Sequence, residues 1–206
     1  MQESEFVRRH PVVFHMTNAT AWPLIRQHGL LSAKAICKLE GLSNGETLRQ
    51  IRTYRSRKVF IGKFILRDQK PLRPHNLVRN LADSGLNSED WCELLNERVF
   101  FATKEMFIRQ LRQSYIDEPV TILVVDTAKL LDCHRDTAQL CRYNSGASRM
   151  PNHMKSRAIF QTLDSATHPP KELTIMDAIP NIEPLLREVI DLSAHVSFRK
   201  ISKAAG

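Results

Sequence analysis

The sequence contains little that would tie this protein to a membrane or to secretion. No apolar run in its 206 residues approaches the length of about 20 residues that crosses a bilayer. Residues 1–10 lack the apolar core of a signal peptide. We therefore expect a cytoplasmic protein that has no membrane partner.

Cysteine is also scarce, and its spacing does not fit the common metal sites. The four cysteines are Cys37, Cys92, Cys133 and Cys141, and no Cys-x-x-Cys pair occurs among them. Cys133-His134 followed by Cys141 matches no common zinc spacing. We expect four free thiols in a reducing compartment and no metal in the functional site.

Several motifs that mark common enzyme folds are missing. There is no Gly-x-Gly-x-x-Gly, so a Rossmann-type dinucleotide site is not expected. Ser145-Gly146 lies outside the Gly-x-Ser-x-Gly frame of a serine hydrolase. With 42% hydrophobic and 25% charged residues, and no internal repeat, the composition is that of a globular protein. Residues 1–206 are predicted to form a single domain.

Positive charge is plentiful and unevenly distributed. The net charge is +8, and residues 49–79 hold ten lysines and arginines against one acid, Asp68. Arg49, Arg52 and Arg55 recur at i, i+3 and i+6, so they would line one ridge of a helix. A concentration of this kind favours a polyanionic partner. These three arginines are therefore predicted to bind nucleic acid.

Apolar periodicity and turn residues predict both helices and strands. The predicted helices lie at about 18–28, 32–57 with a break at 41–45, 74–82, 88–96, 103–111 and 182–192. The predicted strands are 12–17, 59–66, 98–102, 120–126, 136–141, 157–163 and 171–176. The strand at 120–126 is apolar enough to be buried on both faces. Because helices and strands concentrate in different parts of the chain, the pattern favours an α+β domain with a helical, basic segment at about 32–97.

The first strand carries the most distinctive pattern, Val-Val-Phe-His-Met-Thr. Side chains alternate along a strand, so His15 and Thr17 share one face with Val13. Asn18 is predicted to cap the following helix and Gly29 to end it. Strand, His-x-Thr, capped helix and Gly-Leu form a compact unit with one chemically equipped face.

Two later strands carry the other candidate residues. Glu172 and Thr174 share a face of the strand that begins at residue 171 and is followed by Ile-Pro. In Arg98-Val99-Phe100-Phe101-Ala102, the two phenylalanines point to opposite faces, so one of them can line a cleft.

These three segments resemble the motifs of the ADP-ribosyltransferase superfamily, in the branch that includes poly-ADP-ribose polymerases, RNA 2′-phosphotransferases and bacterial DNA-modifying toxins. Residues 67–71, 89–91 and 143–147 also resemble an uncharacterised bacterial family of ADP-ribosyltransferase-like proteins. The resemblance implies a split, mixed or antiparallel sheet with flanking helices. It also implies that NAD is the substrate that donates ADP-ribose.

The resemblance further implies a role for each residue. Glu172 would be catalytic, because a carboxylate stabilises the positive charge that develops when the nicotinamide glycosidic bond breaks. Arg67, Arg98 and Arg157 are candidates to bind the diphosphate, each near the end of a predicted strand. The residues predicted to bind NAD are His15, Met16, Thr17, Arg67, Phe100 and Phe101.

Together these patterns predict an NAD-dependent mono-ADP-ribosyltransferase that modifies DNA or RNA as a bacterial toxin or defence effector. An antitoxin or immunity protein would be a further partner. Two alternatives stay open at this point. One is a nucleic-acid-binding module without catalysis, for which the basic segment alone would suffice. The other is an RNA 2′-phosphotransferase, which would need additional basic residues around a phosphate.

Overall fold

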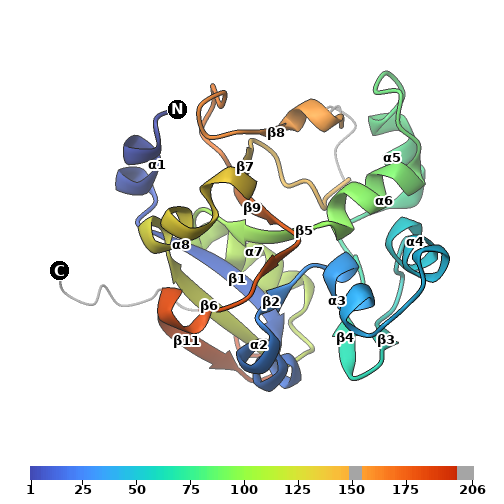
Figure 1. The fold of residues 1–206 in the computed structure, drawn as a ribbon, viewed down its shortest axis with the longest axis horizontal. Helices are drawn as coiled ribbons and strands as arrows, with labels where there is room; N and C mark the ends of the chain where they lie inside the picture. The colour runs from blue at the N-terminus through green and yellow to red at the C-terminus, as the bar shows by residue number, and fades with distance from the viewer. Residues whose placement is uncertain (149–154, 199–206) are drawn as a thin grey trace.

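The computed structural model describes residues 1–148 and 155–198 of the chain. A seven-stranded antiparallel sheet runs through the middle of the molecule, with helices on both of its faces and a separate group of helices beyond one side (Figure 1). This arrangement confirms the predicted α+β class, with an antiparallel sheet and flanking helices.

The strands and helices have the following bounds. The strands of the large sheet are β1 (Val12–Asn18), β5 (Arg98–Ala102), β6 (Val120–Asp126), β7 (Ala138–Cys141), β8 (Phe160–Gln161), β9 (Glu172–Met176) and β11 (Leu186–Leu192). Two small sheets pair β2 (Leu30–Leu31) with β10 (Ala178–Ile179), and β3 (Val59–Ile61) with β4 (Phe64–Leu66). The α-helices are α1 (Glu3–Arg9), α2 (Trp22–His28), α3 (Ala33–Leu39), α4 (Asn44–Arg52), α5 (Pro74–Asn80), α6 (Ser88–Asn96), α7 (Glu105–Ser114) and α8 (Thr127–His134). The 3-10 helices are η1 (Ala19–Ala21), η2 (Arg135–Thr137), η3 (Arg157–Ile159) and η4 (Glu183–Leu185).

The sheet order is β11-β6-β1-β5-β9-β7-β8. All seven residues of β6 are buried, as their continuous apolar run predicts. One face of the sheet packs against α1, α2 and α8, through Phe6, Ile25 and Leu130. The other face packs against α7, whose Ile108 belongs to one buried cluster with Phe14 and Met16 of β1.

The sheet is split between β1 and β5. β1 pairs with β6 along its whole length, from Val12↔Asp126 to Asn18↔Val120. In the described chain, the register between β1 and β5 holds a single pair, Phe14↔Ala102. The two strands therefore separate from His15 onward, in the middle of the sheet.

The segment at 32–97 lies beyond β5 and contains α3 to α6 together with the β3–β4 hairpin (Figure 1). Its helices make two further apolar clusters. Leu77 and Trp91 of α5 and α6 pack with Phe160 of β8. Cys37 of α3 packs with Phe64 of the hairpin. Residues of this segment, including Arg55 and Arg67, help to enclose a space beside the split.

Three predicted elements need correction. Residues 59–66 form a hairpin rather than one strand, because Gly62 takes a φ of +52° and reverses the chain. The predicted helix at 182–192 is η4 followed by the strand β11, which pairs with β6. Thr103 does not cap α7: its hydroxyl donates to the carbonyl oxygens of Pro170 and Lys171, and Lys104 takes the N-cap position.

The first unit of the chain forms largely as predicted. The side chain of Asn18 accepts a hydrogen bond from the Thr20 amide, so it caps the 3-10 helix η1 that leads into α2, and Ala21 takes the N-cap position of α2 itself. Gly29 follows α2 with a φ of +83° and donates its N–H to the Ile25 carbonyl.

Every helix in the described ranges is too short or too polar to cross a bilayer.

Candidate functional site

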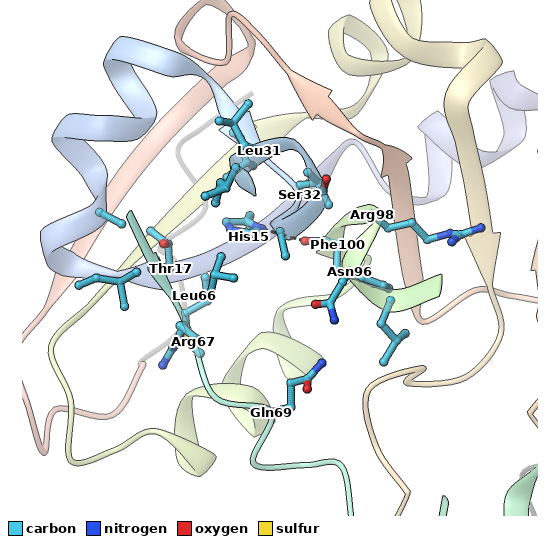
Figure 2. Close-up of a pocket in the computed structure, with 18 of the residues that line it drawn as sticks. His15, Thr17, Leu31, Ser32, Leu66, Arg67, Gln69, Asn96, Arg98 and Phe100 are labelled. Carbon is cyan, nitrogen blue, oxygen red and sulfur yellow. Dashed lines mark hydrogen bonds between the residues drawn. The ribbon is translucent and has the colours of Figure 1, made fainter. Parts of the chain in front are cut away.

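A cavity of about 540 Å³ opens beside the split in the sheet. This volume lies within the range of about 300–1,000 Å³ that is typical of small-molecule sites. Its walls come from β1, β5, β9, the β3–β4 hairpin, α3 and residues 144–146. His15, Arg67, Gln69 and Phe100 line it from different elements (Figure 2). Residues far apart in the sequence therefore meet around one space.

His15 has a defined hydrogen-bonding state in this cavity. Its Nδ1 lies 2.9 Å from the carbonyl oxygen of Phe100, across the split (Figure 2). Because a carbonyl can only accept, Nδ1 carries the proton and Nε2 is left as an acceptor. Burial, with a smaller contribution from the nearby Arg67, lowers the pKa of His15 to about 4 against the opposing effect of the Phe100 carbonyl. At neutral pH this imidazole is an uncharged acceptor.

Glu172 begins β9 and lines the same cavity. Burial raises the pKa of its carboxyl group, while the amide of Ser145 and the charges of Lys155 and Lys171 oppose that rise. The Ser145 N–H donates to Glu172 Oε2 at 3.0 Å. The carboxylate is therefore held in one place in a partly desolvated position.

A buried lysine supports this arrangement from behind. Lys155 is 2% exposed, and its Nζ donates to the Ser145 carbonyl at 2.7 Å. Its Nζ also lies 4.9 Å from the centre of the Trp91 ring. Burial lowers the pKa of Lys155 to about 8, although the negative charge of Glu172 acts in the opposite direction. Lys155, Ser145 and Glu172 thus form one chain of contacts, in which Ser145 is bound on both sides.

Two arginines that line the larger cavity have buried donors without hydrogen-bond partners among the described residues. The Arg67 guanidinium lies 3.8 Å from the Tyr115 ring centre, and its Nη2 lies 3.7 Å from Glu118. Arg55 Nε donates to the Arg67 carbonyl at 2.9 Å. Nε and Nη2 of Arg67 and Nη1 of Arg55 are buried with no hydrogen-bond partner among the described residues. Because buried guanidinium donors without partners are costly, these two arginines favour an anionic group in the cavity.

The structure distinguishes among several predicted residues. Met16 and Thr17 line the larger cavity beside His15. Phe100 lines it as well, whereas Phe101 is fully buried on the opposite face of β5, with its ring edge against His15. Phe100 is therefore the phenylalanine that faces this space.

The three arginines that are candidates to bind the diphosphate differ in their access to this cavity and in the partners that they already have. Arg67 lines the cavity, and its Nε and Nη2 make no hydrogen bond to a described residue, although Nη2 lies 3.7 Å from Glu118. Arg98 also reaches it, but its guanidinium is bound by Gln139 and by the Leu94 carbonyl. Arg157 is exposed on η3 and lies outside the lining of this cavity. Arg67 is thus the best placed of the three.

The predicted ridge of Arg49, Arg52 and Arg55 does not form, because α4 ends at Arg52. Arg52 is bound by three acids of α6, which are Glu89, Asp90 and Glu93. Arg55 lies beyond the helix and lines the larger cavity. Arg49 is exposed, apart from the cavity lining. The three arginines therefore occupy three different environments.

Sequence reasoning missed Lys155, Ser145 and the cavity position of Arg55. Residues 143–147 resemble part of the uncharacterised family, but that resemblance assigns no role to Ser145. Nothing in the sequence around Lys155 indicates that its side chain is buried.

The four cysteines are free thiols, of which Cys133 is exposed.

Comparison with known proteins identifies one family. The profile of a family described as "Family of unknown function (DUF7002)" matches residues 11–186, a range that includes both strands of the split and Glu172. Searches of curated proteins and of solved structures give no significant match.

Proposed function

The chain belongs to the DUF7002 family of unknown function, and we propose from its cleft that it binds NAD and transfers the ADP-ribose group. One observation carries this proposal. A neutral histidine with a free acceptor nitrogen and a partly buried carboxylate line the same cavity, at a split in an antiparallel sheet. Those are the positions that the resemblance to ADP-ribosyltransferases assigns to His15 and Glu172.

The cavity offers complementary groups for each part of NAD. His15 Nε2 accepts a hydrogen bond from a ribose hydroxyl. Met16 lines the cavity where β1 leaves β5, and a backbone N–H and C=O of β1 there would suit the carboxamide of nicotinamide. Arg67, with Arg55 beside it, supplies the cationic donors that a diphosphate needs. The larger cavity thus contains a partner for ribose, for amide and for phosphate.

Glu172 contributes to the chemical step by stabilising the charge that develops on the ribose. As the bond between ribose and nicotinamide breaks, positive charge develops on the ribose ring, and a fixed carboxylate stabilises that charge more than it stabilises bound NAD. The Ser145 amide holds the carboxylate before the reaction begins. His15, which stays neutral, contributes position rather than proton transfer.

We propose nucleic acid as the acceptor, in keeping with a toxin or defence effector. The support is electrostatic. Arg52, Lys58 and Lys70 are bound to acids. Other cations of residues 49–79 are exposed and make no ion pair with a described residue, namely Arg49, Arg57, Arg73 and Arg79. Each cation that reaches a phosphate adds a salt-dependent increment of affinity.

The test is nicotinamide release from NAD by wild type, Glu172→Gln and His15→Ala. Loss of a carboxylate that acts on developing charge should reduce turnover on the order of 100-fold or more, with a smaller effect on NAD affinity. His15→Ala should mainly weaken NAD binding. Glu188→Gln, an exposed carboxylate on β11, is the matched control and should behave as wild type.

Two results would contradict the proposal in different ways. Full activity in Glu172→Gln would remove this residue from the mechanism. Wild type that binds oligonucleotides but shows no NAD binding by calorimetry would favour a nucleic-acid-binding module without catalysis.

A further inference from the structure

A second, smaller cavity of about 160 Å³ adjoins the first. It lies against α7, on the face of the sheet that carries Phe14 and Ala102. The two cavities share residues at the split, and these are His15, Met16, Phe100, Leu111, Asn144 and Glu172. Glu172 therefore lines both spaces, of which the smaller is walled by α7 and the larger by α3 and the β3–β4 hairpin.

We propose that this smaller cavity is the acceptor site and that it receives one nucleobase of an unpaired strand. The inference rests on the proposed function, because it takes the larger cavity as the NAD site. Substitution at the ribose carbon brings the nucleophile in on the side away from the leaving group. Two cavities that meet at one carboxylate provide those two sides.

The size of the cavity limits its occupant. Sites for whole small molecules have volumes of about 300–1,000 Å³, and a space of about 160 Å³ is well below that range. It has room for one ring-sized group, whereas a complete nucleotide would leave its sugar and phosphate outside. An enzyme that acts on a base takes that base out of its stack and into such a pocket.

The walls suit a planar, hydrogen-bonding group. Phe107 is a partly exposed aromatic ring on α7, and Ile108 beside it is buried. The amides of Gln110 and Asn144 are both exposed at this cavity. Asn and Gln amides pair with base edges because each carries a donor and an acceptor. Lys171, whose Nζ lies 5.7 Å from the Phe107 ring centre, adds a cation where the backbone of a strand would pass.

Charged protein side chains fit this space less well. A carboxylate acceptor would lose water against Phe107 and Ile108 and would lie beside the like charge of Glu172. A guanidinium acceptor would face Lys171. A neutral base avoids both costs.

The transfer is balanced without any further reactant. A nitrogen of the base that carries a proton forms the new bond to the ribose carbon. The bond from that carbon to nicotinamide breaks, and its electron pair leaves with nicotinamide. The proton of the attacking nitrogen passes to the Glu172 carboxylate and then to solvent.

The first experiment separates transfer from donor cleavage. Labelled NAD is incubated with short single-stranded oligonucleotides of each base, and nicotinamide release is measured in parallel without acceptor. Phe107→Ala and Gln110→Ala should reduce transfer at least 10-fold and leave release without acceptor within about 2-fold of wild type. Met106→Ala is the matched control, because Met106 is exposed on the same helix outside this cavity. Equal loss of both reactions, or label found on protein alone, would overturn the proposal.

The second experiment does not depend on turnover. Anisotropy measures the binding of a fluorescein-labelled, mixed-sequence single-stranded DNA to wild type, Gln110→Ala, Phe107→Ala and Met106→Ala. Weaker binding in the two cavity variants and unchanged binding in Met106→Ala would support the site even if no NAD were cleaved. Unchanged binding in Gln110→Ala, an exposed position that should not disturb folding, would overturn it.

Discussion

At the scale of single residues, the charge state of Glu172 depends on a side chain that does not touch the cavity. Lys155 binds the carbonyl of Ser145, and Ser145 binds Glu172 through its N–H. The other groups that face Glu172 are Lys171, the residue before β9, and the Cys141 thiol on β7, whose pKa is raised to about 12 by burial and by the carboxylate. Lys155 is therefore a positioning residue that also helps to keep the carboxylate ionised.

Lys155→Met should shift the acid limb of NAD turnover to higher pH. Burial already raises the pKa of Glu172, and loss of the Lys155 charge raises it further. Because the ionised form acts, activity falls as pH drops through this pKa, and the fall should begin at a higher pH than in wild type. Lys155→Arg should keep the wild-type profile, as should Lys129→Met at an exposed site. An unshifted limb in a folded Lys155→Met protein would show that Lys155 is only structural.

The sequence places His15 and Glu172 on strands correctly, because strand alternation and flanking residues are local signals, and both side chains line one cavity. Lys155 and Arg55 are different cases. Each is a long cationic side chain that the sequence suggests is solvated, but tertiary packing buries Lys155 and partly buries Arg55. Burial of this kind depends on tertiary packing, which short-range patterns do not encode.

At the scale of secondary structure elements, β11 shows why periodicity alone misleads. Leu186, Val189 and Ile190 recur at i, i+3 and i+4, which is typical of a helix. In the structure, β6 offers an open edge, and pairing with it places Val189 on one face and Ile190 on the other. Val189 and Ile190 are both β-branched, which favours a strand, and pairing with β6 selects the strand over the helix.

The connection between α2 and β2 requires glycine for two separate reasons. Gly29 has a φ of +83°, and a Cβ there would lie 2.5 Å from the Ile179 carbonyl oxygen. Gly41 has a comparable φ of +74° but has open space around it. Comparing Gly29 with Gly41 therefore separates the cost of a positive φ from the cost of crowding around an added Cβ.

Gly29→Ala should destabilise the protein more than Gly41→Ala does. Strain at a positive φ costs about 1–3 kcal/mol at each site, and Gly29→Ala adds a clash with β10 that the backbone must move to relieve. Chemical denaturation of both variants measures the difference. Equal losses in the free energy of unfolding would show that β10 shifts away from residue 29 at little cost.

At the scale of the whole molecule, the basic segment illustrates the limit of counting charges. Residues 49–79 carry a large positive charge in the sequence. Folding brings Glu118 against Lys58, Arg67 and Lys70, and brings α6 acids against Arg52. Much of this charge is neutralised by residues elsewhere in the chain, so the sequence predicts its amount but not its exposure.

The split in the sheet has a consequence for hydrogen exchange. An edge strand presents unpaired N–H and C=O groups, and β1 has such an edge inside the molecule, where it meets a cavity. Between His15 and Asn18, every second amide faces this inner edge, and the others face β6.

Exchange along β1 should therefore alternate from one residue to the next, with the amides that face the cavity exchanging faster. NMR-detected exchange on the free protein measures this directly, and a ligand that carries an amide should slow only the fast set. Uniformly slow exchange would mean that β1 and β5 pair along their length in the free protein. A ligand that enters the cleft would then have to break that pairing first.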